Sequence, residues 1–266
     1  MRNSRLARMA DGFTAGWEAL RAHMPPLRSP RGIAWLLGRA AGVFGLTSGF
    51  FVLVDREFPE WMPDGEIVVL ALGFLILARF FSQKARYQAQ FGDRAYARAI
   101  SAFGIPGLGI VFASIAHLGY MPGPQIPHLW WRPILVGTGW LSLAVGAALW
   151  WRAVSTLGLD TLAMLYVYYP EERRIVDSGI YSLLRHPVYA AALRVSIGLA
   201  LVRANWYALL VALIVPLFLH GWIRLVEEAE LIRQFPAYVE YRRRVPAFAP
   251  RLPDLGKFWR LLVLGR

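Results

Sequence analysis

Long apolar stretches, separated by short polar connections, most constrain what this chain of 266 residues can fold into. A helix needs about 20 predominantly apolar residues to cross the hydrocarbon core of a bilayer. Stretches of this kind occur at Ile33–Val54, Ile67–Phe81, Ile100–Gly119, Ile134–Trp151, Val188–Val202 and Trp206–Val226. Because backbone polar groups must be satisfied within lipid, we expect all six to be helices. The sequence therefore predicts an all-α, polytopic integral membrane protein with about six transmembrane helices.

The last two stretches are expected to form a helical hairpin. Val188–Val202 is the shortest of the six, follows Pro187, and is separated from the next stretch only by Arg203, Ala204 and Asn205. So short a connection is typical of antiparallel neighbouring helices. The hairpin returns the chain to the side from which it started, where we expect a cytoplasmic C-terminal helix.

Basic residues alternate between the connections. They are frequent before the first stretch and after the second, fourth and sixth, whereas the other connections carry single arginines at Arg56, Arg132 and Arg203. The positive-inside rule then places both termini in the cytoplasm. The membrane that the protein spans is expected to be a bacterial inner membrane or an endomembrane. The net charge of +12 fits loops that face anionic membrane lipid better than it fits nucleic acid.

Residues 1–32 carry apolar side chains at helical spacing. Arginines lie between these side chains, and Pro25 and Pro26 end the pattern. Such a segment is typical of an amphipathic helix that lies on the inner leaflet, although packing against the protein's own cytoplasmic side is an alternative. No apolar core follows the first arginines, so we do not expect a signal peptide. The apolar positions are Leu6, Met9, Phe13, Trp17, Leu20 and Met24.

Glycines recur within two of the apolar stretches. Gly38, Gly42, Gly45 and Gly49 are spaced as in membrane helices that pack closely, and helix packing is the expected role. The segment 104–109 looks faintly like a glycine-rich phosphate loop, but no strand precedes it. We expect its small residues to admit a neighbouring helix and its proline to kink the helix.

No metal site is expected. The chain has no cysteine, which excludes thiolate ligands and disulfides. His23, His117 and His128 have no partner at metal-ligand spacing, so structural roles are assigned to them.

Polar residues gather where the last two stretches meet the cytoplasm. Arg185 and His186 precede the hairpin, and Glu227 and Glu228 follow it. Such groups are costly to desolvate at the edge of a membrane and indicate a functional site by default. Because the hairpin brings the two pairs to the same side, the sequence predicts a polar site at the inner interface, beside lipid.

The residues around these groups resemble a known family. Gly-x-Tyr-x3-Arg-His-Pro-x-Tyr over 179–189, a hairpin, and Glu-Glu-x2-Leu-x3-Phe-x2-Tyr-x2-Tyr-x3-Val-Pro over 227–246 are similar to the isoprenylcysteine carboxyl methyltransferase family. The phospholipid N-methyltransferases share a looser version. The resemblance covers about residues 157–250 and none of the first four stretches. It implies an S-adenosylmethionine-dependent methyltransferase whose cofactor lies in a cytoplasm-facing pocket closed by the C-terminal helix.

The resemblance also implies which residues bind the cofactor. Arg173 departs from the family, which often has histidine there; an arginine would bind the methionine carboxylate in a bidentate manner. Arg185 and His186 are the expected catalytic residues, with Arg185 facing a carboxylate and His186 accepting a proton if the acceptor is an amine. The full cofactor-binding set is Arg173, Ile175, Val176, Gly179, Tyr181, Arg185, His186, Pro187, Tyr189, Glu227 and Glu228.

A lipophilic acceptor is expected to enter from the bilayer. Arg194 and His220, predicted to be buried in the hairpin, are expected to line its entry. Carboxyl O-methylation of an isoprenoid-type substrate is the preferred reaction, and N-methylation of a phospholipid is the alternative. The oligomeric state is left open.

Two other classes of protein are weighed against a methyltransferase. Sterol-type reductases have a similar Arg-His-Pro-Asn-Tyr element that binds NADPH, but Val188 replaces the asparagine here, and the glutamate pair favours methyl transfer. A non-catalytic membrane scaffold or transporter would not explain polar residues clustered on one side.

Four regions follow from these patterns. They are an amphipathic segment (1–32), a four-helix transmembrane region (33–151), a cofactor-binding region with the hairpin (152–253) and a basic tail (254–266).

Overall fold

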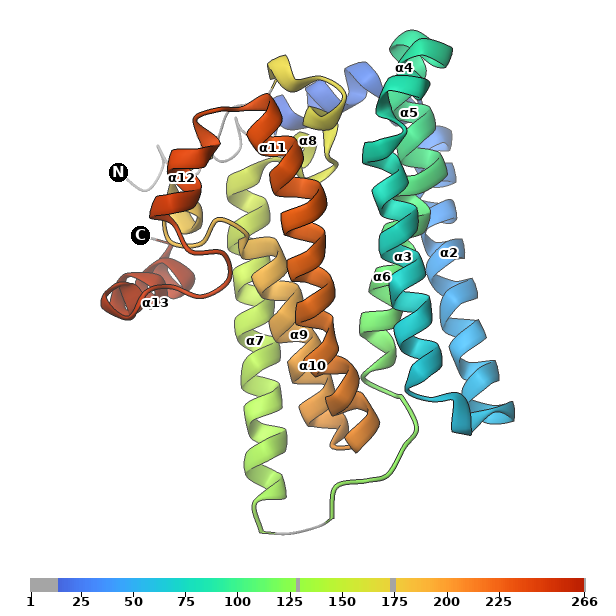
Figure 1. Ribbon diagram of the computed structural model, residues 1–266, viewed down its shortest axis with the longest axis vertical. Coiled ribbons are helices and arrows are strands. Elements are labelled where there is room, and N and C mark those ends of the chain that lie inside the picture. The colour runs from blue at the N-terminus through green and yellow to red at the C-terminus, as the bar shows by residue number, and fades with distance from the viewer. Residues whose placement is uncertain (1–13, 128–129, 173–175, 266) are drawn as a thin grey trace.

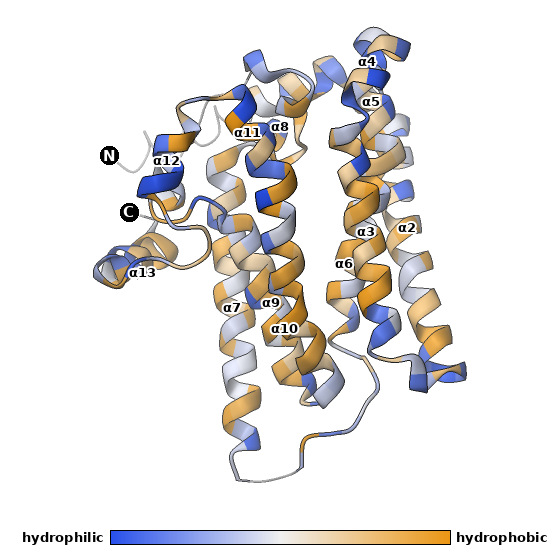
Figure 2. Ribbon diagram, in the orientation of Figure 1, coloured by the Kyte–Doolittle hydropathy of each residue, from blue (hydrophilic) through white to orange (hydrophobic). Residues whose placement is uncertain are grey.

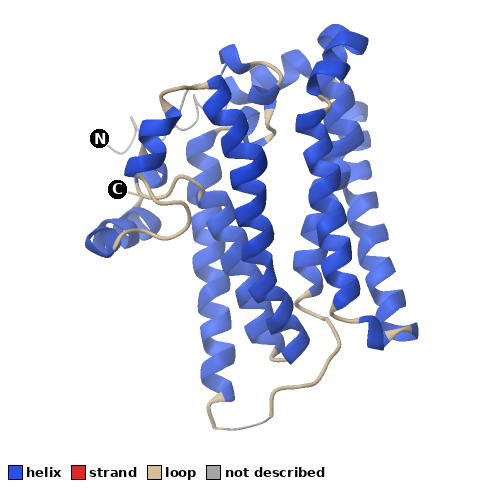
Figure 3. Cartoon of the chain, in the orientation of Figure 1, coloured by secondary structure: helices blue, strands red, loops and turns tan. Residues whose placement is uncertain are grey.

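The computed structural model describes residues 14–127, 130–172 and 176–265 (Figure 1). Helices joined by loops make up this part of the chain, in which no strand is present (Figure 3). Residues 14–23 are helical, and the first part of the predicted amphipathic segment lies outside the described residues. The α-helices that follow are α2 (Pro30–Glu57), α3 (Asp64–Ser82), α4 (Lys84–Phe91), α5 (Ala95–Ala99), α6 (Ile105–His117), α7 (Arg132–Leu157), α8 (Leu159–Leu162), α9 (Pro187–Arg203), α10 (Trp206–Trp222), α11 (Glu228–Gln234), α12 (Tyr238–Arg244) and α13 (Leu255–Leu264).

Short helical turns connect several of these helices. Two are π-helical turns that continue a spanning helix: η4 (Ile100–Gly104) leads into α6 and η8 (Ile223–Glu227) leads into α11. The 3-10 turns are η1 (Pro25–Arg28), η2 (Pro59–Trp61), η3 (Gly92–Arg94), η5 (Leu165–Val167), η6 (Pro170–Glu172), η7 (Gly179–Ser182) and η9 (Leu252–Asp254).

Five helical stretches among the described residues are long and apolar enough to cross a membrane. They are Pro30–Glu57, Asp64–Ser82, Lys84–His117, Arg132–Leu157 and Trp206–Gln234. Four of them contain a predicted apolar stretch, and Lys84–His117 covers all but the last two residues of the predicted Ile100–Gly119. The all-α, polytopic membrane fold is therefore confirmed. The remaining predicted stretch forms α9, whose 17 residues would span only about 25 Å at the rise of an α-helix. That α9 crosses the whole bilayer stays a prediction.

The spanning helices form two bundles (Figure 1). Helices α2, α3 and α6 pack together in the first bundle, and α7, α9 and α10 in the second. Aromatic rings join the two: Phe74 of α3 stacks on Phe218 of α10, with ring centroids 5.9 Å apart, and contacts Trp222 at 5.8 Å. Hydrophilic residues gather at the ends of the helices and on α11 and α12 (Figure 2).

The predicted hairpin is present and its turn is tightly bonded. Ala204 ends α9 in the left-handed conformation, with φ 53°. The Asn205 side chain then accepts a hydrogen bond from the Ala208 N–H at 2.7 Å, which caps the start of α10. The same side chain donates to the Met121 carbonyl at 2.7 Å, so the loop after α6 is fixed to this turn.

Close helix packing occurs at glycines other than the four predicted in α2. A Cβ at Gly139 would lie 2.9 Å from the backbone of Val202 and 3.0 Å from the Gly198 carbonyl, so α7 and α9 approach through glycine. Gly107 of α6 meets Leu77 of α3 in the same way, as expected for the 104–109 segment. In contrast, nothing lies within 4 Å of the Cβ positions of Gly38, Gly42, Gly45 and Gly49, so the predicted packing role is wrong for the described structure.

Candidate active site

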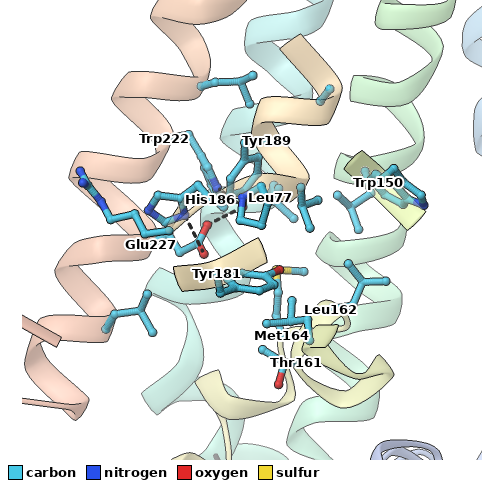
Figure 4. A pocket seen from close by; sticks show the side chains of 18 of the residues that line it. Leu77, Trp150, Thr161, Leu162, Met164, Tyr181, His186, Tyr189, Trp222 and Glu227 are labelled. Atoms are coloured by element: carbon cyan, nitrogen blue, oxygen red, sulfur yellow. Dashed lines mark hydrogen bonds and ion pairs between the residues drawn. The ribbon is translucent and has the colours of Figure 1, made fainter. Parts of the chain in front are cut away.

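A cavity of about 300 Å³ lies between the two bundles, near the end that carries α11 and α12. Both bundles contribute to its wall. One part is apolar and extends along α3 and α6, lined by Phe74, Leu77, Leu108, Val111, Phe112 and Ile115. The other part is polar and is shown in Figure 4, where His186, Glu227, Tyr189 and Tyr181 converge.

Arg185 and His186 are placed by the turn that leads into α9. Pro187 occupies the first position of α9, where its missing N–H costs nothing. The preceding N–H groups are bonded elsewhere: Arg185 N donates to the Pro246 carbonyl at 2.9 Å, and His186 N donates to the Ala247 carbonyl at 3.1 Å. We call residues 245–250 the strap, because this segment after α12 closes over the pair.

Glu228 binds both of these side chains. Its Oε1 accepts from Arg185 Nε at 2.6 Å and lies 3.0 Å from His186 Nε2, and Arg242 Nε approaches its other oxygen at 3.3 Å. The carboxylate is buried, with 1% of the side chain exposed, and charged groups compensate its desolvation. Arg185 Nη1 also donates to the Val245 carbonyl at 2.7 Å. Glu228 thus fixes the orientation of Arg185 and His186.

Glu227 faces the cavity instead. Its carboxylate accepts a hydrogen bond from the Tyr189 hydroxyl, which in turn accepts from Trp222 Nε1 at 3.0 Å (Figure 4). His186 Nδ1 lies 3.9 Å from Glu227, so the imidazole is held between the two glutamates. The two adjacent carboxylates therefore have different positions: one lines the cavity and the other supports its wall.

Two tyrosines of α12 complete this end. The Tyr238 hydroxyl lies 3.3 Å from His186 Nε2 and 3.4 Å from Glu228, and Tyr241 donates to the Tyr181 carbonyl at 2.7 Å. Burial, together with the neighbouring charges of Glu228 and Glu227, raises the pKa of Tyr238 well above its usual range. Tyr238 is therefore a neutral hydroxyl at physiological pH.

The residues predicted from the sequence fall into three groups in the structure. Seven line the cavity: Val176, Tyr181, Arg185, His186, Pro187, Tyr189 and Glu227. Glu228 lies behind this wall, and Gly179 adopts a left-handed φ of 57° beside Thr156, in the turn that presents Tyr181. Arg173 and Ile175 lie outside the described residues.

The two residues expected along the acceptor's entry do not line this cavity. His220 is predicted to be buried, but in the structure it is exposed on α10. Arg194 is half-buried and donates to the Ala190 carbonyl of its own helix at 2.8 Å. The predicted burial of His220 is therefore wrong, and Arg194 is bonded locally.

Several lining residues were missed by the sequence interpretation. Thr161, Leu162, Met164 and Tyr166 come from the segment between α7 and η7. The cluster of aromatic residues at 166–169 was the available signal. Tyr168 donates to the Phe80 carbonyl at 3.2 Å, which fixes this segment to the first bundle.

A second buried polar cluster lies at the opposite end of the first bundle. His117 is completely buried between two carboxylates: Nδ1 bonds to Glu66, and Nε2 lies 2.9 Å from Asp55. The imidazole also stacks on Phe51, with ring centroids 4.3 Å apart. A neutral imidazole has one N–H, so two bonds to carboxylates require one further proton in the cluster. The cluster joins α2, α3 and α6.

Comparisons with known proteins agree with the resemblance in the sequence. Residues 134–237 match the family model described as phospholipid methyltransferase. The protein-S-isoprenylcysteine O-methyltransferase B of Arabidopsis thaliana is 29% identical over 143 residues, which cover 53% of this chain and 69% of the relative. This part of the chain is therefore similar to methyltransferases. The predicted resemblance is thereby confirmed.

Two bacterial relatives are named as metal-resistance proteins, not as methyltransferases. The cobalt-zinc-cadmium resistance protein CzcN of Cupriavidus metallidurans is 36% identical over 126 residues, covering 46% of this chain and 52% of the relative. The nickel-cobalt-cadmium resistance protein NccN of Alcaligenes xylosoxydans xylosoxydans is 32% identical, covering 46% and 63% respectively. The chain thus spans about half to two thirds of the length of these relatives. No solved structure matches the chain.

Proposed function

We propose that the protein is an integral membrane methyltransferase that uses S-adenosylmethionine and acts on a lipophilic acceptor. One observation carries the proposal. A single cavity joins a polar end, lined by Arg185, His186 and Glu227, to an apolar part between two membrane-spanning bundles. A charged cofactor and a lipid-soluble acceptor need these two environments in contact.

The residues at the polar end fit the cofactor. Glu227 is a carboxylate directed into the cavity, suited to ribose hydroxyls or to the cofactor's amino group. Arg185 is cationic and its orientation is fixed by Glu228, so it suits a carboxylate. The cavity volume lies at the lower end of the range for small-molecule sites. When bound, S-adenosylmethionine supplies an electrophilic methyl group on a sulfonium.

The chain's own contribution to the reaction is alignment and exclusion of water. In-line displacement requires acceptor, methyl group and sulfur to be held in one geometry. The bonds from Glu228 and the strap fix Arg185 and His186 before substrates arrive. A carboxylate acceptor needs no base. An amine must lose a proton, and His186, which lines the cavity, is the residue placed to accept it.

Carboxyl O-methylation of an isoprenoid-type acceptor is the preferred reaction, since the ordered motif resembles the isoprenylcysteine enzymes. N-methylation of a phospholipid is the second candidate, favoured by the match of residues 134–237.

Incubating the purified protein with methyl-labelled S-adenosylmethionine and total membrane lipid tests the proposal. Label that mild base releases as a volatile product indicates an ester, and base-stable label in a polar lipid indicates an N-methyl group. Label found only in a water-soluble product would contradict a lipophilic acceptor.

A further inference from the structure

Helix α13 carries an apolar stripe that the described part of the protein leaves uncovered. Phe258 and Leu262 of this helix are buried in a cluster with residues of α7 and η7. Leu255, Trp259 and Val263 lie four residues apart, hence on one line along the helix beside the buried face. These three side chains are 40%, 47% and 67% exposed. Within the predicted basic tail, α13 is therefore a helix with one buried apolar face and one exposed apolar stripe beside it.

The attachment of α13 to α7 sets its depth. Arg152, near the end of α7, donates to the Leu262 and Val263 carbonyls, at 3.0 Å in each case. Its neighbour Trp151 is 66% exposed on the outside of the bundle. Tryptophan and arginine at the end of a spanning helix mark the boundary between membrane and water. Figure 1 shows α13 lying across the direction of α7, hence along this boundary.

The charge around α13 is strongly positive. Six basic and two acidic residues lie between positions 238 and 260. On α13 itself Lys257 and Arg260 are exposed, and Arg251 just before it is exposed too. An apolar stripe with flanking basic residues is the pattern of a helix that binds an anionic membrane surface.

We propose that α13 is an interfacial helix that inserts Leu255, Trp259 and Val263 into the bilayer and binds anionic phospholipid headgroups through Lys257 and Arg260. The strap connects α12 to α13 and accepts hydrogen bonds from the N–H groups of Arg185 and His186. Lipid that holds α13 in place therefore keeps the strap closed over the cavity's polar end. That consequence for cofactor binding rests on the proposed function, whereas the contact with lipid does not.

Backbone hydrogen exchange of the full-length protein in lipid nanodiscs tests this. Discs of phosphatidylcholine alone are compared with discs that also contain phosphatidylglycerol. Amides of 255–264, and those of Arg185 and His186, are expected to exchange more slowly in the anionic discs. Lys257→Gln and Arg260→Gln should each reduce that added protection about fivefold. Trp259→Ser should reduce protection in both lipids. Arg56→Gln is the matched control. Arg56 is an exposed charge in the last turn of α2, so its replacement should leave the exchange of 255–264, Arg185 and His186 unchanged.

Equal exchange in both lipids, unaffected by Lys257→Gln and Arg260→Gln, would overturn the proposal. Protection that instead rises with protein concentration in lipid-free detergent would assign the stripe to a second copy of the chain, and would overturn it too. Exchange requires no substrate, so a failure of the proposed methyl transfer would leave this result unchanged.

Discussion

Glu228 contributes to the site by positioning other side chains. It bonds to Arg185 and His186 at once, and both of these line the cavity. Removing this buried carboxylate takes away the bond that Arg185 and His186 share and leaves both side chains free to reorient.

We therefore predict that Glu228→Ala and His186→Ala each weaken S-adenosylmethionine binding by ten- to a hundredfold, since a hydrogen bond to a charged group contributes about 1.5–3 kcal/mol. Titration calorimetry measures the effect. Glu240→Ala is the control, because that carboxylate is 64% exposed and pairs with Arg244 on the surface of α12. Unchanged affinity in both site variants would place the cofactor elsewhere.

His117 illustrates what sequence spacing does not reveal. A structural role was assigned to it, yet its partners Asp55 and Glu66 lie 62 and 51 residues away and only the packing of three helices brings them together. His117→Leu leaves the buried Glu66 and the largely buried Asp55 without their shared partner, and should cost about 3–5 kcal/mol in unfolding free energy.

Reversible unfolding in mixed detergent micelles measures this cost. Glu57→Gln is the matched control, because Glu57 follows Asp55 by two residues and its side chain is 54% exposed. A His117→Leu protein as stable as that control would show that the cluster contributes nothing to the fold.

At the scale of helices, apolar length and short connections were sufficient to predict the spanning segments and the hairpin. They were not sufficient to predict which glycines pack, since the regularly spaced glycines of α2 face open space whereas Gly139 of α7 and the lone Gly198 of α9 lie in contact. Contact depends on the rotation of each helix against its neighbour, which the spacing of small residues alone does not fix. The same holds for the cavity. The motif located seven of its lining residues, whereas the lining from α3, α6 and 161–166 depends on how the bundles meet.

Two glycines of α7 allow a direct test of this packing. Gly139→Leu should destabilise the protein by about 1–3 kcal/mol, because its Cβ position is already within 3.0 Å of the α9 backbone. Gly137→Leu, two residues away and facing open space, should leave thermal unfolding unchanged. Similar melting temperatures for the two variants would mean that α7 and α9 are not packed through Gly139.

The whole molecule is expected to have one orientation in the membrane. The alternation of arginines among the connections predicts that both termini, and with them the cavity's polar end, face the cytoplasm. Reporter fusions at Gly65 and Gly123 should therefore report an external location, and a fusion after Arg266 an internal one. An external C-terminus would separate the cavity from the cytoplasmic supply of cofactor.

The central claim is that the cavity between the bundles binds S-adenosylmethionine. Equilibrium titration of the purified full-length protein with S-adenosylmethionine, and separately with NADPH, tests it most directly. Saturable binding of S-adenosylmethionine alone, competed by S-adenosylhomocysteine and weakened by Glu227→Ala, is the predicted result. Binding of NADPH in its place would indicate a reductase, and binding of neither would contradict an enzyme of this class.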